Sequence, residues 1–222
     1  MITSIFSKSK PINFIIVFFI ALIAFLIARN NLINKEITIS FAFKQLVLFF
    51  IFYISILLLN FIVSKNNLTK KNNYEILLFS LFVLAIYQAT SDTNILFSNF
   101  FVLLGLRRII SLRSQISVKK KLFDAAFWVA IAALFYFWAI LFFVLILVSL
   151  LLYSENKVNH WIIPFIGVTT VFLITISISI VFNDNFFEIF KSLPEVGYNF
   201  NSYNTLQYLV AITMLLSFGI WS

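Results

Sequence analysis

The chain has 222 residues, of which 62% are hydrophobic and 11% are charged, and its mean hydropathy is +1.05. This composition leaves too little polar surface for a water-soluble globule and predicts an all-α polytopic membrane protein, with residues 1–222 forming a single transmembrane domain. The absence of cysteine excludes disulfides and thiolate chemistry, and the single His160 excludes a histidine cluster. The net charge of +8 does not indicate a nucleic-acid partner, because the basic residues gather in short loops on one predicted membrane side.

Four crossings are predicted in the first half of the chain. Pro11 to Ala28 follows two lysines, has no small-residue cleavage site after it, and is expected to be a retained span that leaves the cytoplasm. The segment from Arg29 to Gln45 is either a short interfacial segment or the frayed start of the second helix. The further crossings are predicted at about Leu46 to Val63, Ile76 to Ala89 and Ile95 to Ile110.

The apolar run from Phe123 to Tyr153 is too long for one crossing. As a single helix it would extend about 46 Å, against a hydrocarbon core of about 30 Å. Two short crossings that turn near Phe137-Trp138 fit better, and Ala126, Ala130 and Ala133 would give the first of them a face that another helix can approach closely. This hairpin also improves the positive-inside balance. It leaves Arg29, Lys35, Lys44 and Lys191 outside and places inside Lys8, Lys10, Lys65, Lys70, Lys71, Arg107, Arg108, Arg113, Lys119, Lys120, Lys121 and Lys157.

The last part of the chain predicts two more crossings, which gives about eight in total. The seventh is Trp161 to Phe182, where threonines and serines are expected to bond back to their own helix. An outer loop from Asn183 to Gln207 contains a predicted surface helix at 186–193, and Tyr208 to Trp221 is the eighth crossing. The run stops without a polar flank, so we expect the protein to be incomplete at its C-terminus.

Three stretches carry a resemblance to a known superfamily. They are 57–65 (LLLNFIVSK), 89–97 (ATSDTNILF) before a helix that ends in Arg107-Arg108, and 119–126 (KKKLFDAA) leading into 134–138 (LFYFW). Their order from Pro11 to Tyr153 resembles the C-type glycosyltransferases, polytopic enzymes that use lipid-phosphate-linked sugars. It also resembles an uncharacterised group of bacterial inner-membrane proteins that are distant relatives of that superfamily.

The resemblance implies acidic residues in two outer loops, and these places hold Glu36 and Asp92. Two outward-facing carboxylates could hold a divalent cation on a sugar-phosphate donor, or one could deprotonate an acceptor. The alternative for Glu36 is a solvated loop charge beside Lys35. The alternative for Asp92 is a turn residue that caps the fourth helix.

Arg107 and Arg108 end the fourth predicted helix on the inner side. They could bind anionic lipid or a polyprenyl phosphate, or they could be snorkelling anchors that fix the topology. Asp124 starts the next helix close to Lys120 and Lys121, where a carboxylate suits the helix dipole, and it is interpreted as structural.

Three functions follow for a protein of the bacterial inner membrane with a cytoplasmic N-terminus. The first is a glycosyltransferase-like protein that acts on lipid-linked sugars at the outer face. The second is a non-catalytic membrane scaffold or assembly partner that kept such a fold. The third is a transporter, which the sequence favours least because no inverted repeat or pair of broken helices is visible.

Overall fold

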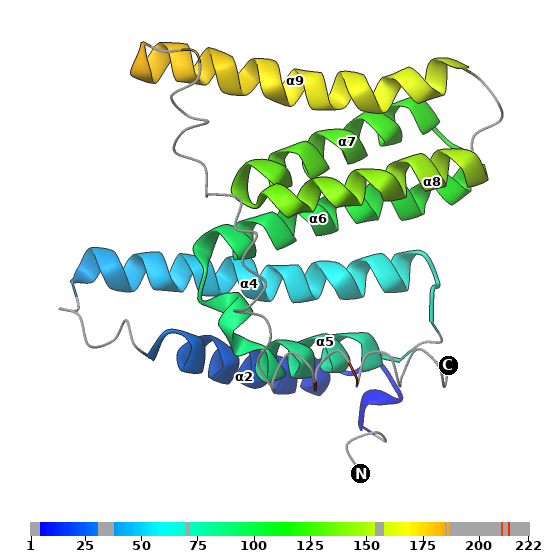
Figure 1. Ribbon diagram of the computed structural model, residues 1–222. Helices are drawn as coiled ribbons and strands as arrows, with labels where there is room; N and C mark the ends of the chain where they lie inside the picture. Colours follow the sequence, from blue (N-terminus) through cyan, green and yellow to red (C-terminus); the bar gives the residue numbers. More distant parts are fainter. Residues whose placement is uncertain are drawn as a thin grey trace. The chain divides into compact units, whose positions relative to one another are not determined.

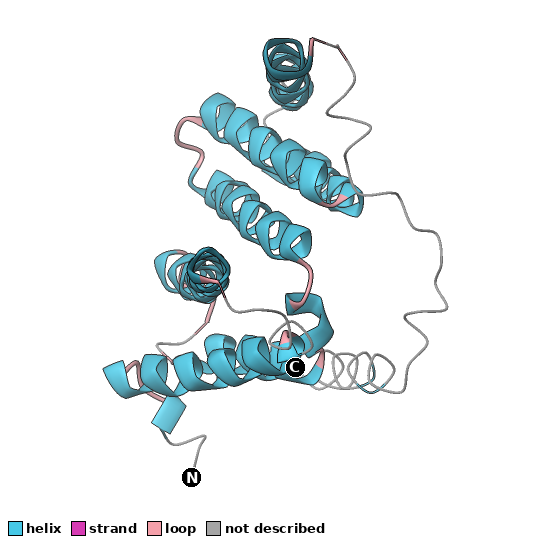
Figure 2. Cartoon of the chain, turned by 90° about the vertical axis from the view of Figure 1, so that its left-hand side faces the viewer, coloured by secondary structure: helices cyan, strands magenta, loops and turns pink. Residues whose placement is uncertain are grey.

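The structure is a computed structural model that describes residues 5–30, 38–69, 72–153 and 158–184, together with Phe186, Val210 and Thr213. Every regular element formed by these residues is a helix (Figures 1 and 2), which confirms the all-α prediction. The chain divides into two compact units, Met1–Leu96 with Gly197–Ser222, and Phe97–Val196, and each is described by itself.

The first unit contains helices α2 (Pro11–Ala28), α4 (Ile39–Lys65) and α5 (Tyr74–Ala85) and the 3₁₀ turn η1 (Tyr87–Thr90). Helix α2 begins at Pro11, because a proline in the first turn costs no hydrogen bond. Helix α4 begins at Ile39, because the Thr38 hydroxyl caps it by accepting the Phe41 N–H at 3.3 Å. Residues 39–45 therefore belong to the second helix, which is one of the two alternatives that the sequence left open.

Aromatic side chains hold α2 against α4. Phe18 meets Tyr53 and Phe25 meets Phe49 in edge-to-face pairs, with ring centroids 5.2 and 5.5 Å apart. The Tyr53 hydroxyl also donates to the Phe14 carbonyl at 3.3 Å. Residues later in α2 contact residues earlier in α4, so the two helices are antiparallel.

The α-helix of the third predicted crossing ends earlier than expected. Helix α5 stops at Ala85, because Ile86 leaves the helical region of the backbone (φ −115°, ψ 53°) and the chain continues as η1. The hydroxyls of Thr90 and Ser91 donate to the carbonyls of Tyr87 and Gln88, which tightens this last turn. The single helix predicted through Ala89 is therefore two elements.

Helix α6 spans Thr93–Ile110, and its part from Phe97 onward belongs to the second unit. There it packs on α7 (Val118–Phe135). Ser98 Oγ donates to the Ala132 carbonyl at 3.0 Å, and Phe101 stacks on Trp128 with centroids 5.7 Å apart. These contacts run in opposite directions along the two helices, so α6 and α7 are antiparallel and are joined by the 3₁₀ turn η2 (Ser111–Ser114).

The apolar run at 123–153 folds into a helical hairpin, as predicted. Helix α7 ends at Phe135, and Tyr136 is extended (φ −145°, ψ 107°). The 3₁₀ segment η3 (Phe137–Phe142) then leads into α8 (Phe143–Tyr153). Ile146 and Leu150 of α8 return to share one buried core whose α7 members are Leu122, Ala125, Ala126 and Val129. The reversal lies beside the predicted turn at Phe137-Trp138.

Helix α9 (Val158–Asn183) approaches α7 closely at Gly167. A Cβ atom at that position would lie 2.9 Å from Ala126 Cβ and 3.0 Å from the Phe123 carbonyl oxygen. The small-residue face is thus confirmed at Ala126, and Ala130 is also buried. The predicted back-bonding is present too, since Thr169, Thr170, Thr175 and Ser177 donate to carbonyls three or four residues earlier.

Among the described residues, four helices are long and apolar enough to cross a membrane. They are Pro11–Ala28, Ile39–Lys65, Thr93–Ser114 and Asn159–Phe182. Shorter apolar helices occupy Tyr74–Ala85 and Phe137–Tyr153. The predicted surface helix at 186–193, apart from Phe186, lies outside the described residues, and so does the predicted eighth crossing at 208–221, apart from Val210 and Thr213.

Candidate functional site at the predicted outer end

The side chain of Arg29 connects three helix ends of the first unit by hydrogen bonds, on the side that the sequence predicts to be outside. It follows α2 directly and its side chain is only 5% exposed. Nε and Nη2 donate to the Thr90 carbonyl at 3.3 and 3.0 Å, and Nη1 donates to Gln45 Oε1 at 2.7 Å. The guanidinium also lies 4.6 Å from the centre of the Phe25 ring. One side chain therefore joins α2, α4 and η1.

The electrostatics of Arg29 depend on Asp92. Burial lowers the pKa of Arg29 below its ordinary value, and the nearby charge of Asp92 acts in the opposite direction. An arginine remains protonated in proteins even so, and the buried cation is stabilised by its hydrogen bonds and by the carboxylate.

Asp92 caps the fourth predicted helix. Its Oδ1 accepts the Asn94 N–H at 2.8 Å, and its carbonyl accepts the Leu96 N–H at 3.3 Å, one residue before α6 begins. The capping role that the sequence left as an alternative is present, and the side chain remains exposed. Capping uses one carboxylate oxygen, so it is compatible with a second role for the other.

The predicted pair of carboxylates is placed only in part. Glu36 lies outside the described residues, so the structure gives a position for Asp92 alone. Within the described ranges, no three residues of the types His, Cys, Asp and Glu are grouped as a metal site would require. The charged side chain that the structure does bring near Asp92 is that of Arg29.

Sequence reasoning missed this cluster. From the sequence, Arg29 is only one of the outer basic residues, and Gln45 ends a segment that is either interfacial or the start of the second helix. The partners of Arg29 lie 16 and 61 positions away, so no local pattern joins them. The available signal was the position of Arg29 directly at the end of an apolar span, where an arginine must either snorkel or find acceptors.

One of the two inner-side arginines is paired with an acidic residue. Arg108 Nη2 lies 2.9 Å from Asp124 Oδ2, and both side chains are partly buried, at 34% and 20% exposure. Asp124 is thus structural, as predicted, and it forms an ion pair with Arg108 of α6. Arg107 is half-buried in the last turn of α6.

Polar atoms are also buried at the opposite end of the first unit. Asn13 Nδ2 donates to the Lys8 carbonyl at 2.9 Å, and the Asn73 N–H donates to the Phe6 carbonyl at 3.0 Å. Among the described residues, Asn13 Oδ1, Asn73 Nδ2 and Glu75 Oε2 are buried without a hydrogen-bond partner.

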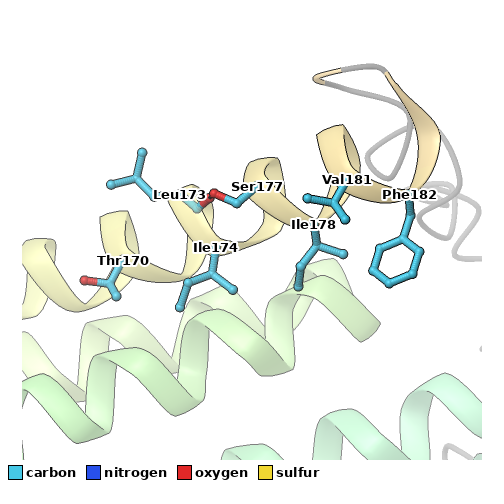
Figure 3. Close-up of a pocket in the computed structure, with 7 residues that line it drawn as sticks. All are labelled: Thr170, Leu173, Ile174, Ser177, Ile178, Val181 and Phe182. Carbon is cyan, nitrogen blue, oxygen red and sulfur yellow. The ribbon is translucent and has the colours of Figure 1, made fainter.

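A shallow groove follows one helix of the second unit. Its lining comes wholly from α9, and Figure 3 shows Ile174 and Ile178 pointing to the same side of the helix while Leu173 points away. Thr170 and Ser177 are the polar members, and both hydroxyls are used within α9. Because no ionisable side chain lines the groove, its surface suits hydrocarbon better than a charged substrate.

Comparison with known proteins identifies the family and no function. No curated protein and no solved structure matches the chain. Residues 1–221 match a family described as "Family of unknown function (DUF6427)". Because the match covers nearly the whole sequence, the chain belongs to the DUF6427 family.

Proposed function

We propose that this chain is a multi-pass protein of the bacterial inner membrane with its N-terminus in the cytoplasm. The four long apolar helices support the crossings, and the distribution of Lys and Arg supports the orientation. In this proposal α5 with η1, α7, and η3 with α8 are three shorter crossings packed among the long helices. The run at 208–221 would be the eighth.

Within the membrane, we propose that the protein serves as a non-catalytic assembly component. The observation that carries this proposal is the burial of Arg29, whose three described hydrogen bonds join α2, α4 and η1. Asp92 is likewise used to begin α6. Charged groups at the predicted outer end thus hold helix ends in position, which is what a partner-binding surface needs and what bond-making chemistry does not require.

A second candidate is the transfer of sugar from a lipid-phosphate donor at the outer face. The observation that favours it is the exposed carboxylate of Asp92, held by its cap beside the Arg29 cation. In this candidate Asp92 and Glu36 are the catalytic or cation-binding acids, a divalent cation is the cofactor, and a polyprenyl-phosphate-linked sugar is the substrate.

One experiment separates the two candidates. A deletion strain is complemented with Asp92→Asn, Glu36→Gln or Arg29→Ala, and the amount of protein in the membrane is measured for each. Asn caps a helix as well as Asp does, so Asp92→Asn removes the charge and keeps the cap.

The assembly role predicts that Asp92→Asn and Glu36→Gln restore the wild-type phenotype to the deletion strain. Arg29→Ala should fail to restore it, because the helix ends that Arg29 joins separate. Loss of complementation by either carboxyl variant at normal protein level favours the transferase and contradicts the assembly role.

A further inference from the structure

We propose that residues 111–121 bind the phosphate headgroup of an anionic phospholipid. These residues, the connection between α6 and α7 together with the first turn of α7, are called the turn below. This inference rests on the proposed membrane location. Three basic side chains of the turn are exposed, Arg113, Lys119 and Lys120, and the apolar Ile116 lies between them with 70% of its surface exposed. Neither inner-side arginine of α6 is needed for this site.

The turn is held in a defined conformation. Lys121 Nζ donates to the Ser111 carbonyl and to Ser114 Oγ, each at 2.6 Å. The Gln115 side-chain amide donates to the Tyr153 carbonyl at the end of α8. Gln115 and Ser117 both have positive φ values, 56° and 52°, which fold the backbone sharply. A ligand that binds here does not have to order the loop first.

The charge of the turn is not neutralised by the protein. The nearest acid along α7, Asp124, is paired with Arg108. Across the ranges described for this unit, no salt bridge involves Arg113, Lys119 or Lys120. The Ser117 side chain makes no capping hydrogen bond, so the first N–H groups of α7 add to the positive potential.

The exposed side chain of Ile116 favours a lipid headgroup over a free anion as the ligand of the turn. A basic surface alone would suit inorganic phosphate as well as a lipid headgroup. A bulky apolar side chain at the tip of the turn gains nothing from a free ion, but it is stabilised where headgroups meet acyl chains. Basic residues around an exposed apolar residue therefore favour an anionic lipid surface.

The test measures lipid binding by the full chain. The protein is purified in a neutral detergent and titrated with phosphatidylglycerol, with phosphatidylcholine as the neutral lipid and inorganic phosphate as the free anion, and bound lipid is counted by native mass spectrometry. The test variant is Arg113→Gln/Lys119→Gln/Lys120→Gln. The matched control is Lys8→Gln/Lys10→Gln/Lys65→Gln, which removes three exposed charges from the same predicted membrane side in the first unit.

We expect the wild type to retain phosphatidylglycerol over phosphatidylcholine, and each charge lost from the turn to lower its affinity about fivefold. The control triple variant should stay within about twofold of wild type, and Ile116→Ser should weaken lipid binding without changing the response to phosphate. Equal losses in test and control variants, or displacement of the lipid by inorganic phosphate, would overturn the lipid site. Extraction of the wild type from membranes by alkaline carbonate would instead contradict the proposed function, so the two failures are distinguishable.

Discussion

Replacing Arg29 with alanine tests the role of the buried guanidinium at the predicted outer end. The substitution removes three hydrogen bonds and a ring contact and leaves the Thr90 carbonyl and the Gln45 amide without their donor. Each buried acceptor left without its donor costs about 1 to 3 kcal/mol, so the two together cost about 3 kcal/mol or more. For a chain of this size, that loss corresponds to a fall of about 6 to 12 °C in the unfolding midpoint.

The absence of native cysteine makes the measurement direct. Ser80 is fully buried in α5 of the same unit, so a Ser80→Cys background reacts with a thiol-reactive dye only when that unit opens. Arg29→Lys should lose about half as much stability as Arg29→Ala, because one ammonium group cannot reproduce the planar fork of donors. Lys44→Ala, an exposed charge beside Gln45, is the control and should leave the midpoint unchanged. A midpoint for Arg29→Ala that equals the control refutes this reasoning.

Two further outcomes are expected. Gly167→Ala should lower the stability of the second unit by about 1 to 2 kcal/mol, because its new methyl carbon meets the facing backbone of α7. Gly105→Ala, whose new carbon meets a side-chain carbon first, should be nearly neutral. Unfolding midpoints from tryptophan fluorescence on heating check this, and a lower midpoint for Gly105→Ala than for Gly167→Ala contradicts the packing account. A double-mutant cycle of Arg108→Ala and Asp124→Ala should give a coupling energy of about 0.5 to 1 kcal/mol that weakens in high salt, and zero coupling at low salt argues against the pair.

The parts of the fold that could be predicted are those set by length and local pattern. The run at 123–153 is too long for one crossing, and it does fold back beside Trp138. Pro11 marks the start of α2, and Ala126 marks the face that α9 approaches. Each of these signals acts within a few turns of one segment, so the sequence alone contains it.

The parts that could not be predicted depend on contacts between distant segments. Helix α4 begins at Ile39 because the Thr38 hydroxyl caps it. The sequence around Thr38 fits an interfacial segment equally well, so this start could not be predicted. The break at Ile86 follows from how the chain turns into η1. The bond between Arg29 and the Thr90 carbonyl spans 61 positions, and Asp124 pairs with an arginine from another helix.

The orientation of the two helix ends is the central claim, and single-cysteine labelling in intact cells tests it most directly. Ser91 lies beside Asp92 at the predicted outer end and Ser114 lies in the predicted inner turn, and both are exposed. A thiol reagent that cannot cross the membrane should label Ser91→Cys in intact cells and Ser114→Cys only after the cells are permeabilised. Labelling of Ser114→Cys in intact cells, with Ser91→Cys protected, would contradict the orientation and with it both proposed roles of the outer end.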